Sequence, residues 1–225
     1  METNRATFLA AAAGTAIAAS SASAVQAAGS YDRSKMEAIL GRPARHRHII
    51  GYPRLQNSAA MRSAAHIMGA YQFAFGEGPG TVNIVVALYG PGTVMMLAND
   101  EFWATTKAYD LTTALGELPP TTIRGPRNPF YHAHTSLSPH DDPEDPAGYW
   151  HDYSVEALTK RGVSWFVCNE AMHTAARELE RLGDGTAASN LAKLKAHLLP
   201  GTLIVPSGSQ SLVVAQERHF TYQAA

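Results

Sequence analysis

The first periodic pattern of apolar residues lies between Asn57 and Phe75. Asn57 is a residue type that caps helix N-termini, because its side chain can accept a hydrogen bond from a free backbone amide. After it, apolar side chains recur at three- and four-residue spacing, at Met61, Ala64, Ala65, Met68, Tyr71 and Phe75. This spacing predicts an amphipathic helix whose apolar face packs against a sheet.

Three short runs rich in β-branched and other apolar residues predict strands, two of them interior strands that are covered on both faces. The runs at 82–89 and 163–168 are the ones that predict such interior strands, and the run at 202–206 predicts a third strand. Segments of helical composition lie between and after them, at 94–97, 102–115, 155–161, 170–182, 187–198 and 211–218. Strands that alternate with helices indicate βαβ units, so the pattern predicts an α/β domain with a mainly parallel sheet.

Two stretches interrupt this alternation. In residues 28–56, Pro43 and Pro53 discourage a helix, so we expect an irregular N-terminal segment. Residues 117–153 are rich in proline, histidine and acidic residues and predict a long irregular insertion within a domain that spans 57–225. The N-terminal segment also carries a basic cluster, either solvated or docked on a partner, that consists of Arg42, Arg45, Arg47 and Arg54.

Composition narrows the class of protein. The chain has 225 residues, of which 45% are hydrophobic and 16% are charged, as expected for one globular domain. The formal net charge of −1 argues against a protein whose main role is to bind nucleic acid or an anionic lipid surface. The overall charge therefore identifies no partner.

Residues 1–27 predict a cleaved signal peptide. An Ala-rich apolar run is followed by small residues, with cleavage expected after Ala24 or Ala27. The run is too short and too weakly apolar to span a bilayer, so we expect a periplasmic or otherwise exported protein with no membrane span after cleavage. Arg5 resembles the first arginine of a twin-arginine signal, but Ala6 occupies the place of the second, which leaves the export route open. A disordered Ala/Ser tail is the alternative.

Cys168 is the only cysteine, so it cannot form an intramolecular disulfide. It ends the predicted strand 163–168 and precedes the predicted helix 170–182. Ligands of open α/β sheets gather at the carboxyl ends of strands, and a helix amino end favours the thiolate form of a thiol. Cys168 is therefore either a reactive thiol or a buried space-filling residue.

Other groups are expected at the same end of the sheet. Asn169 follows the cysteine directly, and His173 is either a proton partner for the thiol or an ordinary helix surface residue. Glycine-containing turns after two strands offer backbone amides to an anion such as a thiosulfonate or a carboxylate, or simply end those strands. Their residues are Gly90, Gly92, Ser207 and Gly208.

Histidines and acidic residues raise the alternative of a metal site. The pairs are His46 with His48, His132 with His134, His140 with Asp141 and Asp142, and His151 with Asp152. Imidazoles at such spacing bind zinc or copper, but no pair lies on a recognisable metal scaffold, and the proline-rich acidic context is typical of a solvated loop. The sequence predicts no metal and no cofactor: it has no haem-attachment motif, phosphate-binding glycine fingerprint or serine nucleophile elbow.

From Asn57 to the C-terminus, the chain resembles the DsrE/DsrF-like sulfur-relay superfamily. The resemblance lies in the order of the elements and in the segments Tyr89–Gly92, Leu158–Val163, Trp165–Cys168, Leu198–Ser209 and Leu212–Tyr222. It implies a small doubly wound sheet with helices on both faces, assembly into trimers or hexamers, and a persulfide on a cysteine at the position of Cys168. Two features differ from the small cytoplasmic sulfur carriers of that superfamily, namely the predicted export and the insertion at 117–153.

Two functions follow from the sequence. The first is an exported thiol-based sulfur carrier, similar to a sulfurtransferase, that exchanges sulfur with a donor and an acceptor through Cys168. The second is a non-catalytic oligomeric module that binds a small ligand or a metal.

Overall fold

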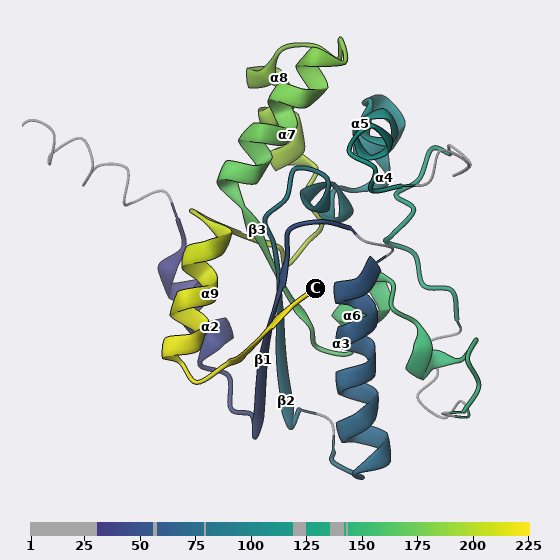
Figure 1. Ribbon diagram of the computed structural model, residues 1–225, viewed down its shortest axis with the longest axis vertical. Helices are drawn as coiled ribbons and strands as arrows, with labels where there is room; N and C mark the ends of the chain where they lie inside the picture. The colour runs from purple at the N-terminus through teal and green to yellow at the C-terminus, as the bar shows by residue number, and fades with distance from the viewer. Residues whose placement is uncertain (1–30, 56–57, 79, 119–124, 136–141, 143) are drawn as a thin grey trace, which may run out of the picture.

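The computed structural model describes residues 31–55, 58–78, 80–118, 125–135, 142 and 144–225. Its centre is a sheet of five parallel strands in the order β4-β3-β2-β1-β5 (Figure 1). The strands are β1 (His46–Tyr52), β2 (Val82–Leu88), β3 (Ser164–Cys168), β4 (Leu203–Val205) and β5 (Thr221–Ala224). The mainly parallel α/β fold that the sequence predicts is therefore confirmed.

Helices cover both faces of the sheet. On one face, α2 (Arg33–Leu40) and α9 (Gly208–Glu217) lie side by side, as Figure 1 shows. Between these helices and the strands lies a small hydrophobic core, to which both contribute. It consists of Leu40, Ile49, Val85, Ala87, Phe166, Leu203, Val205, Ala215 and Phe220. Because alternate strand residues point to opposite faces, the other half of each buried strand is left for a second core.

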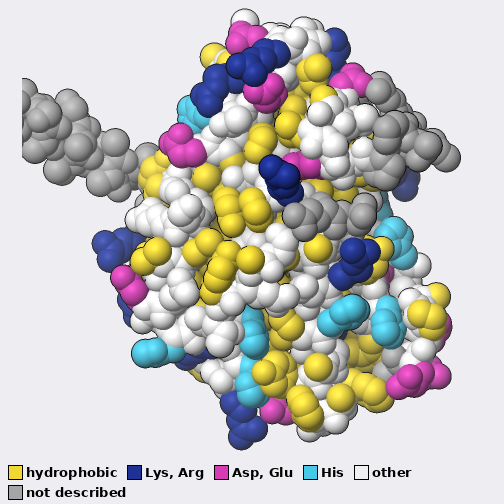
Figure 2. Space-filling model, in the orientation of Figure 1, with side chains coloured by type: hydrophobic (Ala, Val, Ile, Leu, Met, Phe, Trp, Pro, Cys, Tyr) yellow, Lys and Arg dark blue, Asp and Glu magenta, His cyan; other side chains and the backbone are white. Residues whose placement is uncertain are grey.

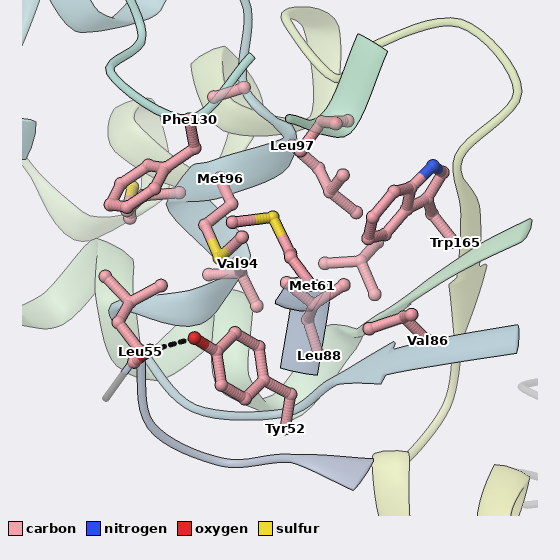
Figure 3. Packing of buried hydrophobic residues seen from close by; sticks show 14 of the residues in the cluster. Tyr52, Leu55, Met61, Val86, Leu88, Val94, Met96, Leu97, Phe130 and Trp165 are labelled. Carbon is pink, nitrogen blue, oxygen red and sulfur yellow. Dashed lines mark hydrogen bonds between the residues drawn. The ribbon is translucent and has the colours of Figure 1, made fainter. Parts of the chain in front are cut away.

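The second core is the larger one. It lies under α3 (Ala59–Gly69), the 3₁₀-helix η3 (Thr93–Leu97) and α6 (Val155–Lys160). Figure 3 shows Met61, Met96 and Leu97 gathered around Val86 and Leu88 of β2.

The remaining helices lie at and beyond the carboxyl ends of the strands. They are α4 (Asp100–Thr105), α5 (Ala108–Ala114), α7 (Asn169–Arg181) and α8 (Ala187–Ala196), with the 3₁₀-helix η4 (Tyr149–His151) on the side of α3. Helices α7 and α8 form an antiparallel pair, which Asn190 joins by donating side-chain hydrogen bonds to the carbonyls of Ala176 and Asp184. Within the described residues, no helix is long and apolar enough to cross a membrane.

The prediction of an irregular segment over residues 28–56 is wrong for α2 and β1, which span residues 33–40 and 46–52. Asp32 caps α2 by accepting a hydrogen bond from the Lys35 amide at 2.7 Å. Pro43 and Pro53 flank β1 instead of interrupting it, and the strand has a half-exposed first part and a buried second part. The polar start of β1 hid its strand character in the sequence, because a buried interior strand is normally apolar throughout.

Part of the predicted basic cluster also has a structural role. Arg42 is half-buried, and its guanidinium donates to Asn83 Oδ1 at 3.0 Å and to Ser164 Oγ at 2.6 Å. These bonds tie the loop after α2 to β2 and β3, so the Arg42 side chain is not free to dock on a partner. Burial lowers the pKa of Arg42.

The helix predicted from Asn57 to Phe75 is confirmed only in its first part. Asn57 lies outside the described residues, and α3 begins at Ala59. After Gly69 the backbone widens into a π-helix, η2 (Ala70–Ala74), none of whose residues is buried. Phe75 is 72% exposed, so the apolar repeat runs on into a surface-exposed aromatic end.

The insertion over 117–153 is described only in part, since 119–124, 136–141 and 143 lie outside the described residues. Two side chains fasten the described parts to the domain. Asn128 donates to the carbonyls of Met96 at 2.8 Å and Ala98 at 2.6 Å. The Asp152 carboxylate accepts from the amides of His134 at 2.7 Å and Ser154 at 2.9 Å. The predicted leader, residues 1–27, lies outside the described residues as well.

Candidate functional site

The candidate site is the point where two neighbouring strands send the chain to opposite faces of the sheet. After β3 the chain enters α7, whose buried side chains join the larger core. After β4 it enters α9, whose buried Ala215 joins the smaller core. Cys168 at the end of β3 pairs in register with Val205 at the end of β4. In open α/β sheets, ligands bind at the carboxyl edge where such a divergence lies.

Cys168 lies at this divergence, in the place that the sequence predicts. It is the N-cap residue of α7, and its Sγ accepts a hydrogen bond from the Ala171 amide at 3.4 Å. The sulfur therefore points at the unpaired amides of the first helical turn, where the helix dipole favours negative charge. The residue is free of any disulfide and only 4% exposed.

Asn169, the first residue of α7, is also buried and is 7% exposed. Within the described part of the chain, its Oδ1 has no hydrogen-bond partner. A buried carbonyl oxygen without a partner costs about 1–3 kcal/mol of stability. A bound molecule that donates a hydrogen bond beside Cys168 would remove this cost.

The amino end of a second helix lies at the same edge. Ser207 is the N-cap residue of α9, and its side chain makes no capping hydrogen bond. Gly208 lets this helix approach the end of β2 closely, because a Cβ at Gly208 would lie 2.2 Å from Tyr89 Cβ. The amino ends of α7 and α9 thus both start at the carboxyl edge of the adjacent strands β3 and β4, an arrangement that favours an anion.

The turn after β2 serves this purpose less well than the sequence suggests. The Gly90 amide donates to Thr93 Oγ1 at 3.0 Å, so in this conformation it is not free to bind an anion. A Cβ at Gly90 would lie 1.7 Å from the Pro53 carbonyl oxygen, which explains the glycine by close packing of the ends of β1 and β2. At Gly92 the space is filled by the Glu117 carboxyl, whose Oε2 would lie 1.6 Å from a Cβ.

Glu117 is a chemically distinctive group at this edge that the sequence analysis did not single out. Its Oε2 is buried and, among the described residues, has no hydrogen-bond partner. Burial raises the pKa of Glu117 to about 7, although the positive charge of Arg54 acts in the opposite direction. In sequence Glu117 is one acid at the start of the insertion, and only the fold brings it against Gly92.

Within the described residues, His173 makes no contact with the Cys168 sulfur that would support a role as proton partner. It is half-exposed and lies beside the buried stripe of α7, which consists of Asn169, Ala171, Met172, Ala175, Ala176 and Leu179. The structure therefore gives no support to a role for His173 as proton partner.

In two of the histidine pairs of the sequence, the first histidine contacts a carboxylate. His46 Nε2 lies 3.0 Å from Glu77 Oε1, and the His46 ring stacks on Tyr71. His132 Nε2 lies 2.9 Å from Asp100 Oδ2. Figure 2 shows several histidines on the lower part of one face, among hydrophobic side chains. His140 and Asp141 lie outside the described residues, and among the residues that are described no group of three or more His, Cys, Asp or Glu could hold a metal ion.

A groove opens on the face of α2 and α9, at the free edge of β4. Its cavity volume is about 550 Å³, and its lining includes Met36 of α2, Val205 and Pro206 at the end of β4, and Val214 of α9. At its rim, Arg218 forms an ion pair with Glu37 at 2.7 Å. The groove reaches Val205, the register partner of Cys168, but Cys168 is not part of its lining.

No protein-family model, curated protein or solved structure matches this chain. The carboxyl edge of the sheet, where Cys168, Asn169 and the amino ends of α7 and α9 lie, is the candidate functional site.

Proposed function

We propose that this protein is an exported sulfur carrier of the DsrE/DsrF-like type, which holds a sulfane sulfur on Cys168 as a persulfide. The observation that carries this proposal is the position of the only thiol. Cys168 caps α7 at the edge where the chain leaves β3 and β4 in opposite directions. A thiolate and a terminal persulfide are both anions, so the amide groups of the first turn of α7 stabilise both.

The reaction is a thiol exchange on sulfur. The Cys168 thiolate attacks the outer sulfur of a donor persulfide, a new sulfur–sulfur bond forms, and the donor thiolate leaves with the electrons of the broken bond. An acceptor thiolate then attacks the outer sulfur on Cys168 and takes it away, which returns the Cys168 thiolate. No net oxidation or reduction occurs, so the carrier needs no redox cofactor.

Burial of the thiol is compatible with a carrier. A persulfide with little exposure is protected from stray oxidants and thiols, because reactivity depends on access as well as on ionisation. At 4% exposure, Cys168 is open only to small donors or to a partner that inserts its sulfur into the edge. We expect selective reactions and slow reaction with bulky reagents.

Intact-protein mass spectrometry tests the proposal. The mature protein, reduced and then exposed to a small sulfane-sulfur donor, is expected to gain the mass of one sulfur atom, whereas a Cys168→Ser variant gains none. An unchanged mass for a reduced wild-type thiol that a small alkylating reagent does reach would refute the sulfur carrier.

A specific observation favours the second function, a ligand-binding module. The groove between α2, α9 and the edge of β4 has the volume of a small-molecule site. If the thiol takes up no sulfur, this groove becomes the main candidate site, and the protein is then better described as an exported binding protein. The resemblance also implies a trimer or hexamer, which sedimentation of the mature protein measures.

A further inference from the structure

Glu117 is partly buried, and its buried carboxyl oxygen, Oε2, has no hydrogen-bond partner among the described residues. The carboxyl group lies directly on Gly92, at the carboxyl edge of β2, in space that any larger residue would occupy. A carboxyl group that serves only stability is normally paired or hydrogen-bonded when it is buried.

The position of Gly92 brings Glu117 to the side of the sheet edge that holds Cys168. Gly92 is the N-cap residue of η3, and η3 packs against both β3 and α7, the two elements that meet at Cys168. The strand registers agree with this placement, since Leu88 of β2 pairs with Val167 of β3. Glu117, which packs on Gly92 after β2, and Cys168, at the end of β3, therefore lie at the carboxyl ends of neighbouring strands.

Among the described residues, Arg54 and Tyr52 interact electrostatically with Glu117. Arg54, in the loop after β1, acts on the Glu117 carboxyl with its positive charge. At the end of β1, the negative charge of Glu117 raises the pKa of Tyr52, and the positive charge of Arg62 on α3 lowers it. The Tyr52 hydroxyl donates to the Leu55 carbonyl, as Figure 3 shows, so it is committed to that loop. Burial raises the pKa of Glu117 to about 7, and the carboxyl can then give up or accept a proton near neutral pH.

From this arrangement we propose that Glu117 is the general acid of the sulfur-carrier site, donating a proton to the thiolate that leaves when Cys168 takes up sulfur. The inference rests on the function proposed above. In the step, the Cys168 thiolate bonds to the outer sulfur of an alkyl persulfide and the sulfur–sulfur bond of the donor breaks. The departing alkyl thiolate takes the proton of Glu117, which leaves a free thiol and the Glu117 carboxylate.

Two donors with different leaving groups test this assignment. An alkyl persulfide releases a basic thiolate, which benefits from a proton, whereas an aromatic thiosulfonate releases a sulfinate, a weak base that leaves without one. The rate at which Cys168 gains sulfur is measured by mass spectrometry with each donor. The proteins are the wild type, Glu117→Gln, which keeps the shape and loses the proton, and the matched control Glu180→Gln, at the exposed end of α7.

We expect Glu117→Gln to slow uptake from the alkyl persulfide about 100-fold, the usual contribution of general acid catalysis, and to leave uptake from the thiosulfonate within about twofold of the wild type. Glu180→Gln should change neither rate. Equal slowing with both donors would show a structural effect and overturn the acid role, and so would unchanged rates with both. In those two cases wild-type uptake still supports the carrier. If the wild type gains sulfur from neither donor, the carrier proposal fails, and the role of Glu117 fails with it.

Discussion

At the scale of single residues, the carboxyl edge holds groups that carry a cost in stability. Asn169 Oδ1 and Glu117 Oε2 are both buried without a partner among the described residues. Such costs are common at functional sites, where the arrangement serves a bound molecule and not the empty fold. Sequence alone could place Cys168, because a strand-to-helix junction is a local pattern, but it could not find Glu117, whose surroundings come from residues distant in the chain.

The raised pKa of Glu117 predicts a dependence of stability on pH. Its pKa rises from 4.5 to about 7 in the folded state, so between these values the folded chain binds more protons than the unfolded chain. Stability should therefore fall as pH rises from about 4.5 to about 7 and change little at higher pH. Because the carboxyl is only partly buried, solvent screening reduces the expected loss to about 2 kcal/mol. Urea unfolding of the wild type and of Glu117→Gln across this range measures the effect. An equally steep fall in the variant would contradict the assignment.

Alanine substitutions at two glycines distinguish a glycine required by close packing from one that is not. Replacing Gly90 by Ala puts a Cβ 1.7 Å from the Pro53 backbone oxygen, which cannot move without shifting β1. We expect a loss of about 3 kcal/mol or more in the free energy of unfolding. At Gly69, in α3, a Cβ meets nothing within 4 Å, so alanine should stabilise the protein by about 0.5–1 kcal/mol. Chemical denaturation of both variants checks the contrast, and a Gly90→Ala protein as stable as the wild type would disprove the packing argument.

At the scale of elements, the sequence was most reliable where a segment is buried on both faces. The runs at 82–89 and 163–168 correspond to β2 and β3, which are covered from both sides. The apolar pattern did not predict β1 or β5. The first half of β1 is only half-buried, and β5 is exposed along its whole length. Edge and half-exposed strands lack the apolar pattern and depend on their neighbours for pairing.

Asp152 is one of the side chains that hold the described parts of the insertion on the domain. Burial raises the pKa of this carboxylate, but hydrogen bonds from Ser154, His134 and Thr135 outweigh that effect and lower its pKa overall. Its contribution to stability should be present at neutral pH and lost as pH falls below the usual range for aspartate. We expect Asp152→Asn to cost about 2 kcal/mol at neutral pH and to increase hydrogen exchange at the amides of residues 134 and 135. Exchange that stays at the wild-type rate would argue against this anchor.

At the scale of the whole molecule, the topology gives the site its place. The chain passes from the α2 face of the sheet to the α3 face at β1 and returns to the first face after β4, so the adjacent ends of β3 and β4 lead to opposite faces. The sequence predicted the α/β class and the junction at Cys168. It could not predict that β4 departs to the opposite face, because β4 has only three residues and the strand order depends on contacts across the whole chain.

A cycle of loading and discharge on the purified protein tests whether Cys168 carries sulfur. Cys168 is loaded with isotopically labelled sulfane sulfur, the donor is removed, and a small acceptor thiol is added while the label is followed. The proposed carrier should hold close to one labelled sulfur per chain and release it to the acceptor, and Cys168→Ser should hold none. Label that does not bind to a reduced and accessible Cys168, or that binds equally to the serine variant, would show that Cys168 is not a sulfur carrier.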